Sequence, residues 1–330
     1  MRPFAYVRAA DAAEALRLGG EAGAQYLAGG TTLIDLAKLD VMRPETVVDL
    51  GGLAARHGAI AADGSGLTLG AMARMAEVAE HPAVLRDYPV IAQSLQLAAS
   101  QQIRNMATLA GNLLQRTRCP YFRDVSWSQC NKRVPGSGCA AIGGVNRRLA
   151  VLGVSEACIA SYPGDFAQAL VALDTVVELT GAEGSRTLPL EQLHRLPGTT
   201  PHIETELKPG ELITALRVPA ARWTRRSLYL KVRDRASYEF AAASAAVALD
   251  IHEGAVREAR IALGGVATKP WRAREAEALL AGKPLDEAAA TAAADAAFAG
   301  AVTHGDNAHK PELGRRTLVR ALLQAAAMEA

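Results

Sequence analysis

The sequence predicts an α+β protein of more than one domain, and three observations support this fold class. The chain has 330 residues, half of them hydrophobic, which is enough for two or three domains with cores. Its first part contains short apolar runs of strand length, separated by glycine turns and helices. Its last part contains an antiparallel meander followed by three helices, a pattern typical of a separate α+β domain.

The elements of the first part follow from caps, turns and apolar periodicity. Asp11 and Glu14 have the spacing of a capping box, so a helix should begin there and end at the glycines that follow. A short strand at 25–28 leads into a glycine turn and a helix from Leu33. We further expect strands at 46–50, 176–179, 185–190 and 212–218, a hairpin of 59–61 with 67–70, and helices at 75–79, 90–99 and 166–173.

The last part begins after a domain junction. Pro219 and the basic run 222–226 mark this junction. The elements expected beyond it are strands at 228–232, 241–251 and 256–263, and helices at 272–280, 286–298 and 313–327.

Composition excludes several functional classes. The net charge is +2, so no global basic excess favours binding of nucleic acid or of an anionic membrane. The N-terminal residues 1–7 lack the apolar segment of a signal peptide, and no later run is long and apolar enough to span a bilayer. We therefore expect a chain without nucleic-acid binding or membrane insertion that carries no export signal of its own.

The turn after the strand at 25–28 has the composition of an anion-binding loop. It contains two glycines and two threonines, Gly29 to Thr32, directly before a helix. Glycines let backbone N–H groups approach a phosphate, hydroxyls add donors, and a helix N-terminus adds partial positive charge. An ordinary tight turn that caps a helix has the same composition, and the dinucleotide fingerprint Gly-x-Gly-x-x-Gly is absent.

All four cysteines lie in one stretch, which follows a Gly-Asn turn at Gly111 and Asn112. This clustering favours a metal site over a disulfide framework. The spacings contain no C-x2-C knuckle, and four thiolates can hold either zinc or a [4Fe–4S] cluster. Seven cations and one acid between Arg116 and Arg148 favour an anionic cluster, although a basic solvated loop with free or zinc-bound thiols has the same composition. The candidate ligands are Cys119, Cys130, Cys139 and Cys158.

Several motifs resemble the FAD-binding subunits of molybdenum hydroxylases, a family that includes the medium subunits of xanthine dehydrogenase and CO dehydrogenase. The cysteine loop and the run 231–238 are similar to those of the FAD subunits of bacterial periplasmic aldehyde oxidoreductases. A minority of the family, including the 4-hydroxybenzoyl-CoA reductase type, carries a [4Fe–4S] cluster in an inserted loop. The motifs shared with the whole family are Ala28–Leu33, Thr108–Asn112, the Tyr-Pro-Gly-Asp turn ending at Asp165, and Gly264–Ala267 with Lys269-Pro270-Trp271.

The resemblance covers essentially the whole chain and implies its domain organisation. Residues 1–221 would form a PCMH-type, vanillyl-alcohol-oxidase-like FAD-binding domain of two α/β subdomains, with an iron–sulfur loop at 113–160. Residues 222–330 would form an antiparallel sheet with helices, like the C-terminal domain of CO dehydrogenase flavoproteins.

The resemblance also implies where FAD binds. Thr108, Gly111 and Asn112 would form a wall beside the ribityl chain and phosphates. Thr31 stands where flavoproteins of this fold with covalent FAD often have histidine, so FAD should bind non-covalently. The residues expected to wrap the pyrophosphate through backbone N–H groups are Tyr26, Leu27, Ala28, Gly29, Gly30, Thr31, Thr32, Leu33 and Ile34.

Three further residues match flavin-site positions of the family. Asp165 would hydrogen-bond the cofactor, although an aspartate before an apolar helix is also a standard N-cap. Ile213 would pack near the isoalloxazine ring, where an apolar strand residue is otherwise ordinary core. Lys231 would lie near the flavin, whereas the sequence alone indicates a surface charge.

The functional expectation is an electron-transfer subunit. The sequence offers no acid–base pair for substrate chemistry, and the resemblance implies a large partner with a molybdenum cofactor and a small partner with [2Fe–2S] clusters. In this heterotrimer, electrons from an aldehyde would reach FAD and then an external acceptor. Two rivals are a self-sufficient FAD oxidoreductase and a zinc-stabilised binding module without redox function. A partner's twin-arginine signal would place the complex in the periplasm, with the cytoplasm as the alternative.

Overall fold

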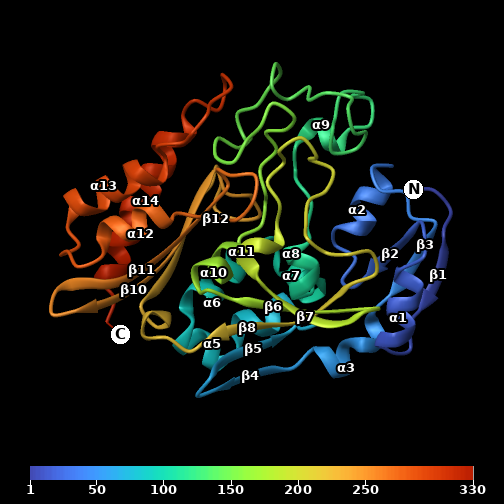
Figure 1. Cartoon of the computed structure of the whole chain (residues 1–330), viewed down its shortest axis with the longest axis horizontal. Helices are drawn as coiled ribbons and strands as arrows, with labels where there is room; N and C mark the ends of the chain where they lie inside the picture. Colours follow the sequence, from blue (N-terminus) through green and yellow to red (C-terminus); the bar gives the residue numbers. More distant parts are fainter. Residues whose placement is uncertain (330) are drawn as a thin grey trace.

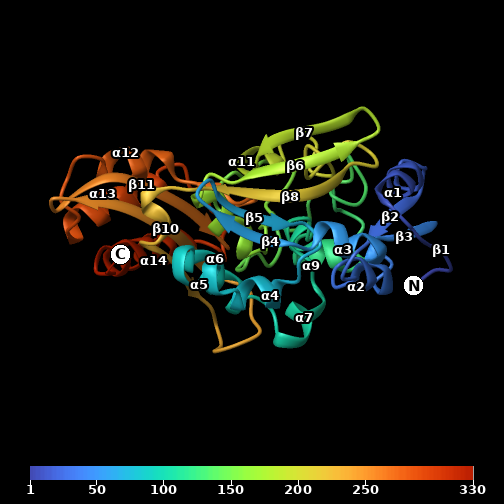
Figure 2. The same ribbon diagram turned by 90° about the horizontal axis from the view of Figure 1, so that it is seen from below.

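The structure is a computed structural model that describes residues 1–329 and contains three sheets. A small N-terminal sheet lies on one side of a central five-stranded sheet, and a four-stranded C-terminal sheet lies on the other side (Figures 1 and 2). Each sheet carries its own helices, so the predicted α+β class is confirmed. No helix within residues 1–329 combines the length and the apolar character needed to cross a membrane.

The N-terminal unit is a parallel sheet with strand order β1-β3-β2. The predicted cap is present, because the carboxylate of Asp11 accepts the N–H of Glu14 at 2.9 Å and Glu14 accepts that of Ala10 at 2.8 Å. The elements are β1 (Ala5–Arg8), α1 (Ala12–Gly19), β2 (Ala24–Leu27), α2 (Leu33–Lys38), β3 (Thr46–Asp49), η1 (Gly51–Leu53) and α3 (Ala54–His57).

The central sheet is antiparallel, with strand order β4-β5-β8-β6-β7. Its strands are β4 (Ile60–Asp63), β5 (Gly66–Gly70), β6 (Val176–Gly181), β7 (Gly184–Pro189) and β8 (Leu212–Pro219). The helices around it are α4 (Met75–Glu80), α5 (Pro82–Asp87), α6 (Pro89–Gln96), α7 (Gln101–Met106), α8 (Leu109–Leu113), α10 (Phe166–Ala172) and α11 (Leu190–Leu193).

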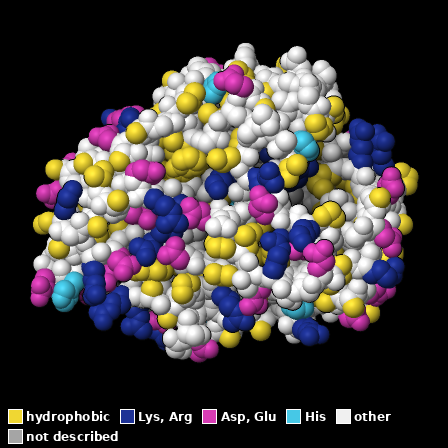
Figure 3. Space-filling view, in the orientation of Figure 1, with side chains coloured by type: hydrophobic (Ala, Val, Ile, Leu, Met, Phe, Trp, Pro, Cys, Tyr) yellow, Lys and Arg dark blue, Asp and Glu magenta, His cyan; other side chains and the backbone are white. Residues whose placement is uncertain are grey.

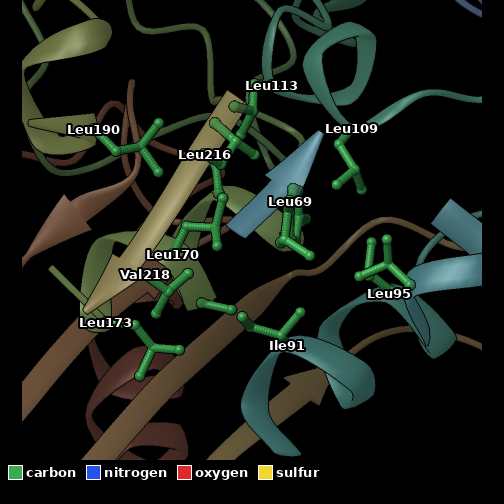
Figure 4. Packing of buried hydrophobic residues seen from close by; sticks show 14 of the residues in the cluster. Leu69, Ile91, Leu95, Leu109, Leu113, Leu170, Leu173, Leu190, Leu216 and Val218 are labelled. Carbon is green, nitrogen blue, oxygen red and sulfur yellow. The ribbon is translucent and has the colours of Figure 1, made fainter. Parts of the chain in front are cut away.

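One face of the central sheet packs against these helices in the largest hydrophobic core. Leu69 of β5 pairs with Leu216 of β8, so the two side chains lie on the same face. Figure 4 shows strand and helix side chains meeting in this core, among them Leu69, Ile91, Leu95, Leu109, Leu113, Leu170, Leu173, Leu190, Leu216 and Val218.

The C-terminal sheet is buried on both faces. On β10, Ala246 and Ala248 face the central core, while Val247 and Leu249 face a second core under the C-terminal helices. Alternation along a strand explains this division, and the alanines let α10 approach the sheet closely. The elements are η2 (Arg222–Thr224), β9 (Ser227–Val232), β10 (Ala243–His252), β11 (Ala255–Gly264), β12 (Trp271–Arg272), α12 (Arg274–Leu280), α13 (Glu287–Ala297) and α14 (Lys310–Ala326).

The cysteine loop crosses the top of the molecule in Figure 1 and contains one short helix, α9 (Pro120–Arg123). Phe122 and the cysteines pack with Leu36 of α2 in a small hydrophobic cluster. The far end of the loop is tied to the C-terminal region, where Asn307 donates to Ala150 O at 3.0 Å and buried Lys310 donates to Arg148 O at 3.1 Å. The loop therefore has a defined path over both neighbouring units.

Most predicted elements are confirmed within a few residues, and the exceptions have local causes. The segment Gly111-Asn112 lies inside helix α8 rather than in a turn, because Thr108 caps a helix that begins at Leu109. The helix expected to reach residue 99 ends at Gln96, and Ala99 adopts a φ of 49°. Arg272 belongs to β12 because its backbone pairs with Ala262 of β11, so α12 begins only at Arg274.

The surface agrees with the nearly balanced charge of the sequence. On the face shown in Figure 3, basic and acidic side chains are interspersed over the sheets and helices. This face therefore has no broad area of positive charge of the kind that binds nucleic acid.

Candidate functional site

A cavity of about 560 Å³ lies between the N-terminal unit, the central unit and the C-terminal sheet. The loop after β2, helix α8, the start of α10, the cysteine loop and the β9–β10 connection all contribute to its walls. Four of the predicted flavin residues line it: Thr31, Thr32, Asn112 and Asp165. Its size is within the range of small-molecule and cofactor sites.

The first glycine loop is held against the chain that precedes α8. A Cβ placed on Gly29 would lie 2.1 Å from Met106 O, so only glycine permits this backbone contact. Gly30 has a φ of 73°, which also favours glycine. Thr32 occupies the N-cap position of α2, but its hydroxyl makes no capping hydrogen bond. The loop therefore presents Thr31 and Thr32 to the cavity on a fixed backbone.

The second predicted wall of the flavin site, at Thr108 to Asn112, contains a buried polar atom without a hydrogen-bond partner in the described residues. Thr108 uses its hydroxyl to accept the N–H of Gly111 at 3.3 Å, which fixes the start of α8. Asn112 donates to the sulfur of Met75 at 3.4 Å, while its Oδ1 is buried and has no hydrogen-bond partner within residues 1–329. A buried acceptor of this kind is costly unless a ligand or water satisfies it. Asn112 therefore fits a ligand-binding role.

Asp165 does not cap α10. Its side chain makes no capping hydrogen bond, and one oxygen instead accepts the hydroxyl of Tyr229 at 2.6 Å. The other oxygen accepts the ammonium of Lys231 at 2.8 Å, and both partners come from β9. Burial raises the pKa of Asp165, while Lys231 and Tyr229 oppose this shift. The side chain of Lys231 is thus buried, although the sequence alone indicated a surface charge.

The remaining predicted flavin residues lie outside the cavity lining. The phenol of Tyr26 donates to Gly210 O at 2.7 Å, and burial raises its pKa to about 12. Ile213 packs in the central core. Leu33 packs into the protein at the start of α2. The backbone contacts predicted for Tyr26, Leu27, Ala28, Leu33 and Ile34 stay predictions.

The four cysteines converge on one small cavity of about 10 Å³, which they line together with Tyr121 and Phe122. The mutual interaction of Cys139 and Cys158 lowers the pKa of Cys139 and raises that of Cys158. Burial raises the pKa of Cys119 to about 11. Four soft donors suit zinc or an iron–sulfur cluster, but within residues 1–329 no three His, Cys, Asp or Glu side chains have the geometry of a metal site.

Two arginines that line the cavity of about 560 Å³ were not assigned to it from the sequence. Arg118 and Arg123 line this cavity and bind Asp35 of α2, which lies one turn beyond the threonines. The sequence did show a basic run here, which we associated with the thiols. Only the folded path of the loop reveals that part of this charge faces the cavity lined by Thr31 and Thr32.

Two family models match this chain. The model described as "FAD binding domain in molybdopterin dehydrogenase" matches residues 2–221. The model described as "CO dehydrogenase flavoprotein C-terminal domain" matches residues 228–330.

Similar proteins span the full length. The aldehyde oxidoreductase FAD-binding subunit PaoB of Escherichia coli (strain K12) is 46% identical over 329 residues, covering 99% of both chains. The carbon monoxide dehydrogenase medium chain of Hydrogenophaga pseudoflava is 27% identical and covers 97% of this chain and 96% of its own. The structure of reconstituted CO dehydrogenase from Oligotropha carboxidovorans superimposes with a TM-score of 0.78 at 26% identity, covering 99% of both chains.

The fold and the matched family models define a flavin-binding subunit of an oxidoreductase. The chain belongs to the family of FAD-binding medium subunits of molybdenum hydroxylases, which confirms the family resemblance and the fold that it implied.

Proposed function

We propose that this chain is the electron-transfer subunit of a molybdenum-dependent aldehyde oxidoreductase. Electrons would arrive from [2Fe–2S] clusters on a small partner and leave through FAD to an external acceptor. The observation that carries this proposal is the cavity, which is lined by Asn112, whose Oδ1 has no hydrogen-bond partner in the described residues, and by Thr32, whose hydroxyl makes no capping hydrogen bond. The similarity of the chain to an aldehyde oxidoreductase subunit supports it. FAD when bound supplies the exchange between two-electron and one-electron transfer.

The residues of the chain would bind and orient the cofactor. Backbone N–H groups from Tyr26 to Ile34 would hold the pyrophosphate, and Asn112 would satisfy its open acceptor with a donor of the ligand. Asp165 would present an oriented carboxylate, because Lys231 and Tyr229 already hold both of its oxygens. Thr108 and Gly111 would hold the start of α8, which carries Asn112, and Ile213 would pack near the isoalloxazine ring from the central core. These roles require positioning and exclusion of water but no acid–base chemistry on an aldehyde.

We propose in addition a [4Fe–4S] cluster on the four cysteines. Their convergence and their softness support this proposal, and zinc is the alternative with the same donors. The proposed domain division is 1–221 for the FAD-binding domain, with the iron–sulfur loop at 113–160, and 222–330 for the C-terminal domain. The matched ranges 2–221 and 228–330 support this division.

The proposed complex is a heterotrimer with a large molybdenum-cofactor subunit and a small [2Fe–2S] subunit. Its location would be the periplasm if a partner carries the export signal, and the cytoplasm otherwise. A 4-hydroxybenzoyl-CoA reductase-like complex is a second candidate, because an inserted cysteine loop also occurs in that type.

Copurification and spectroscopy test the proposal. The chain, expressed with its neighbouring genes and purified through a tag on this subunit, should retain two partner chains and molybdenum. The isolated chain should show flavin absorption near 450 nm on a broad iron–sulfur background. A colourless chain that contains zinc and binds no partner would contradict the proposal.

A further inference from the structure

Two arginine side chains leave the cysteine loop and enter the flavin cavity. Arg118 directly precedes Cys119, and Arg123 ends helix α9. Both line the cavity of about 560 Å³ together with Thr31 and Thr32. The loop that carries the thiols is therefore also a wall of the flavin cavity.

Both arginines bind one acid, Asp35, on helix α2, which follows directly after the glycine loop. Arg123 donates to both oxygens of Asp35, at 2.7 and 3.0 Å, and Arg118 donates to Oδ2 at 3.3 Å. The hydrogen bond from Arg123 lowers the pKa of Asp35, so this carboxylate is ionised at neutral pH. An ionised acid so close to the threonines would repel a phosphate unless cations neutralised it.

The charges around the cavity leave one positive charge in excess at Arg118 and Arg123. Arg148 binds Asp234 and Glu239, at 3.2 and 3.3 Å, and Arg235 lies 4.0 Å from Glu239, so these two arginines balance two acids. Asp165 is neutralised by Lys231. Arg118 and Arg123 share the single charge of Asp35, and the Nε of Arg118 is buried without a hydrogen-bond partner in the described residues. The glycine loop from Gly29 to Thr32 contributes no cation of its own.

We propose that Arg118 and Arg123 bind the pyrophosphate of the dinucleotide, so that the cysteine loop supplies the positive charge of the flavin site. This inference rests on the proposed flavin site. Guanidinium groups favour phosphate oxygens through charge-assisted hydrogen bonds. The stability of the cysteine loop and the retention of FAD are then coupled, because the same segment carries the thiols and the arginines.

Binding of FAD and of riboflavin to the full chain, freed of flavin, tests the assignment. Riboflavin has the isoalloxazine ring but no phosphate. The double variant Arg118→Gln/Arg123→Gln should bind FAD about a hundredfold more weakly, about tenfold for each lost charge-assisted contact, and bind riboflavin within about twofold of wild type. The salt dependence of FAD binding should also become weaker.

Two variants control for folding. Arg116→Gln removes a cation from the same loop with nearly the same side-chain exposure, 23% against 25%, but Arg116 binds Glu204 outside the cavity and should leave FAD affinity unchanged. Arg118→Lys/Arg123→Lys keeps the charge and should retain most of the affinity. Equal losses of FAD and riboflavin, or a loss of the same size in Arg116→Gln, would overturn the assignment. Failure of the wild-type chain to bind FAD would refute the proposed flavin site instead.

Discussion

The ammonium of Lys231 lies 2.8 Å from the carboxylate of Asp165, and only 1% and 4% of the two side chains are exposed. Lys231 belongs to β9 of the C-terminal sheet, whereas Asp165 precedes α10, which packs in the central core. The ion pair therefore joins two units of the protein at the edge of the cavity that Asp165 lines. Tyr229 donates to the second oxygen, so the carboxylate is fixed before any ligand binds.

Removing the lysine should destabilise the chain. Lys231→Met leaves Asp165 buried without its counter-charge and should lower the free energy of unfolding by about 3–5 kcal/mol. Adding Asp165→Asn to this variant removes the uncompensated charge and should recover part of the loss. Urea unfolding of the four forms checks this, and strictly additive effects would contradict an interacting pair.

Changing the glycine loop should release FAD. Gly30→Val places a β-branched residue at a φ of 73°, which costs about 1–3 kcal/mol and moves backbone away from the ligand. FAD content per chain should fall sharply, while the assembled complex should still reduce its molybdenum and [2Fe–2S] centres with aldehyde. The matched control is Gly300→Ala, because a Cβ there meets nothing within 4 Å. Full FAD content in Gly30→Val would contradict the assignment.

Replacing any one of the four cysteines should remove the proposed cluster. Serine is a poor ligand at neutral pH, so Cys119→Ser, Cys130→Ser, Cys139→Ser and Cys158→Ser should each lose iron and acid-labile sulfide. Ser128→Ala, an exposed position of the same loop, should change neither quantity. A cysteine whose loss leaves the iron content intact is not an essential ligand, and stoichiometric zinc in the wild type would favour the zinc alternative.

His194 should make stability depend on pH in the acid range. Burial lowers its pKa to about 4, and its Nε2 hydrogen-bonds Leu113 O at 2.9 Å. Because the unfolded state takes up a proton near pH 6.5 and the folded state does not, the stabilisation is complete above that pH. It is lost as the pH falls toward 4, by up to about 3 kcal/mol. The free energy of unfolding in urea should differ less between pH 7 and pH 4.5 in His194→Gln than in the wild type. In the exposed control His202→Gln this difference should equal that of the wild type.

The sequence predicted the elements and the sites that depend on local chemistry. The strand, glycine turn and helix around Gly29 are local, and so is the capping of α1 by Asp11. The grouping of the thiols was also predictable, because all four cysteines lie on one loop. The four thiols line one small cavity, and their role as cluster ligands stays a prediction.

What the sequence could not predict depends on long-range packing. Asp165 has the local pattern of an N-cap, and only the position of β9 shows that Lys231 and Tyr229 bind it instead. Arg118 and Arg123 belong to a basic run next to the thiols, but the path of the loop turns them toward α2. In both cases a residue far away in the sequence decides the role of the side chain.

Anaerobic mixing with an aromatic aldehyde tests the central claim most directly. The isolated chain loaded with FAD should keep its absorption near 450 nm, because the proposed function places aldehyde oxidation on a partner subunit. Addition of the molybdenum and [2Fe–2S] partners should bleach this absorption rapidly. Aldehyde-dependent bleaching of the flavin in the isolated chain would contradict the claim that this subunit only transfers electrons, and would identify it as a complete oxidoreductase.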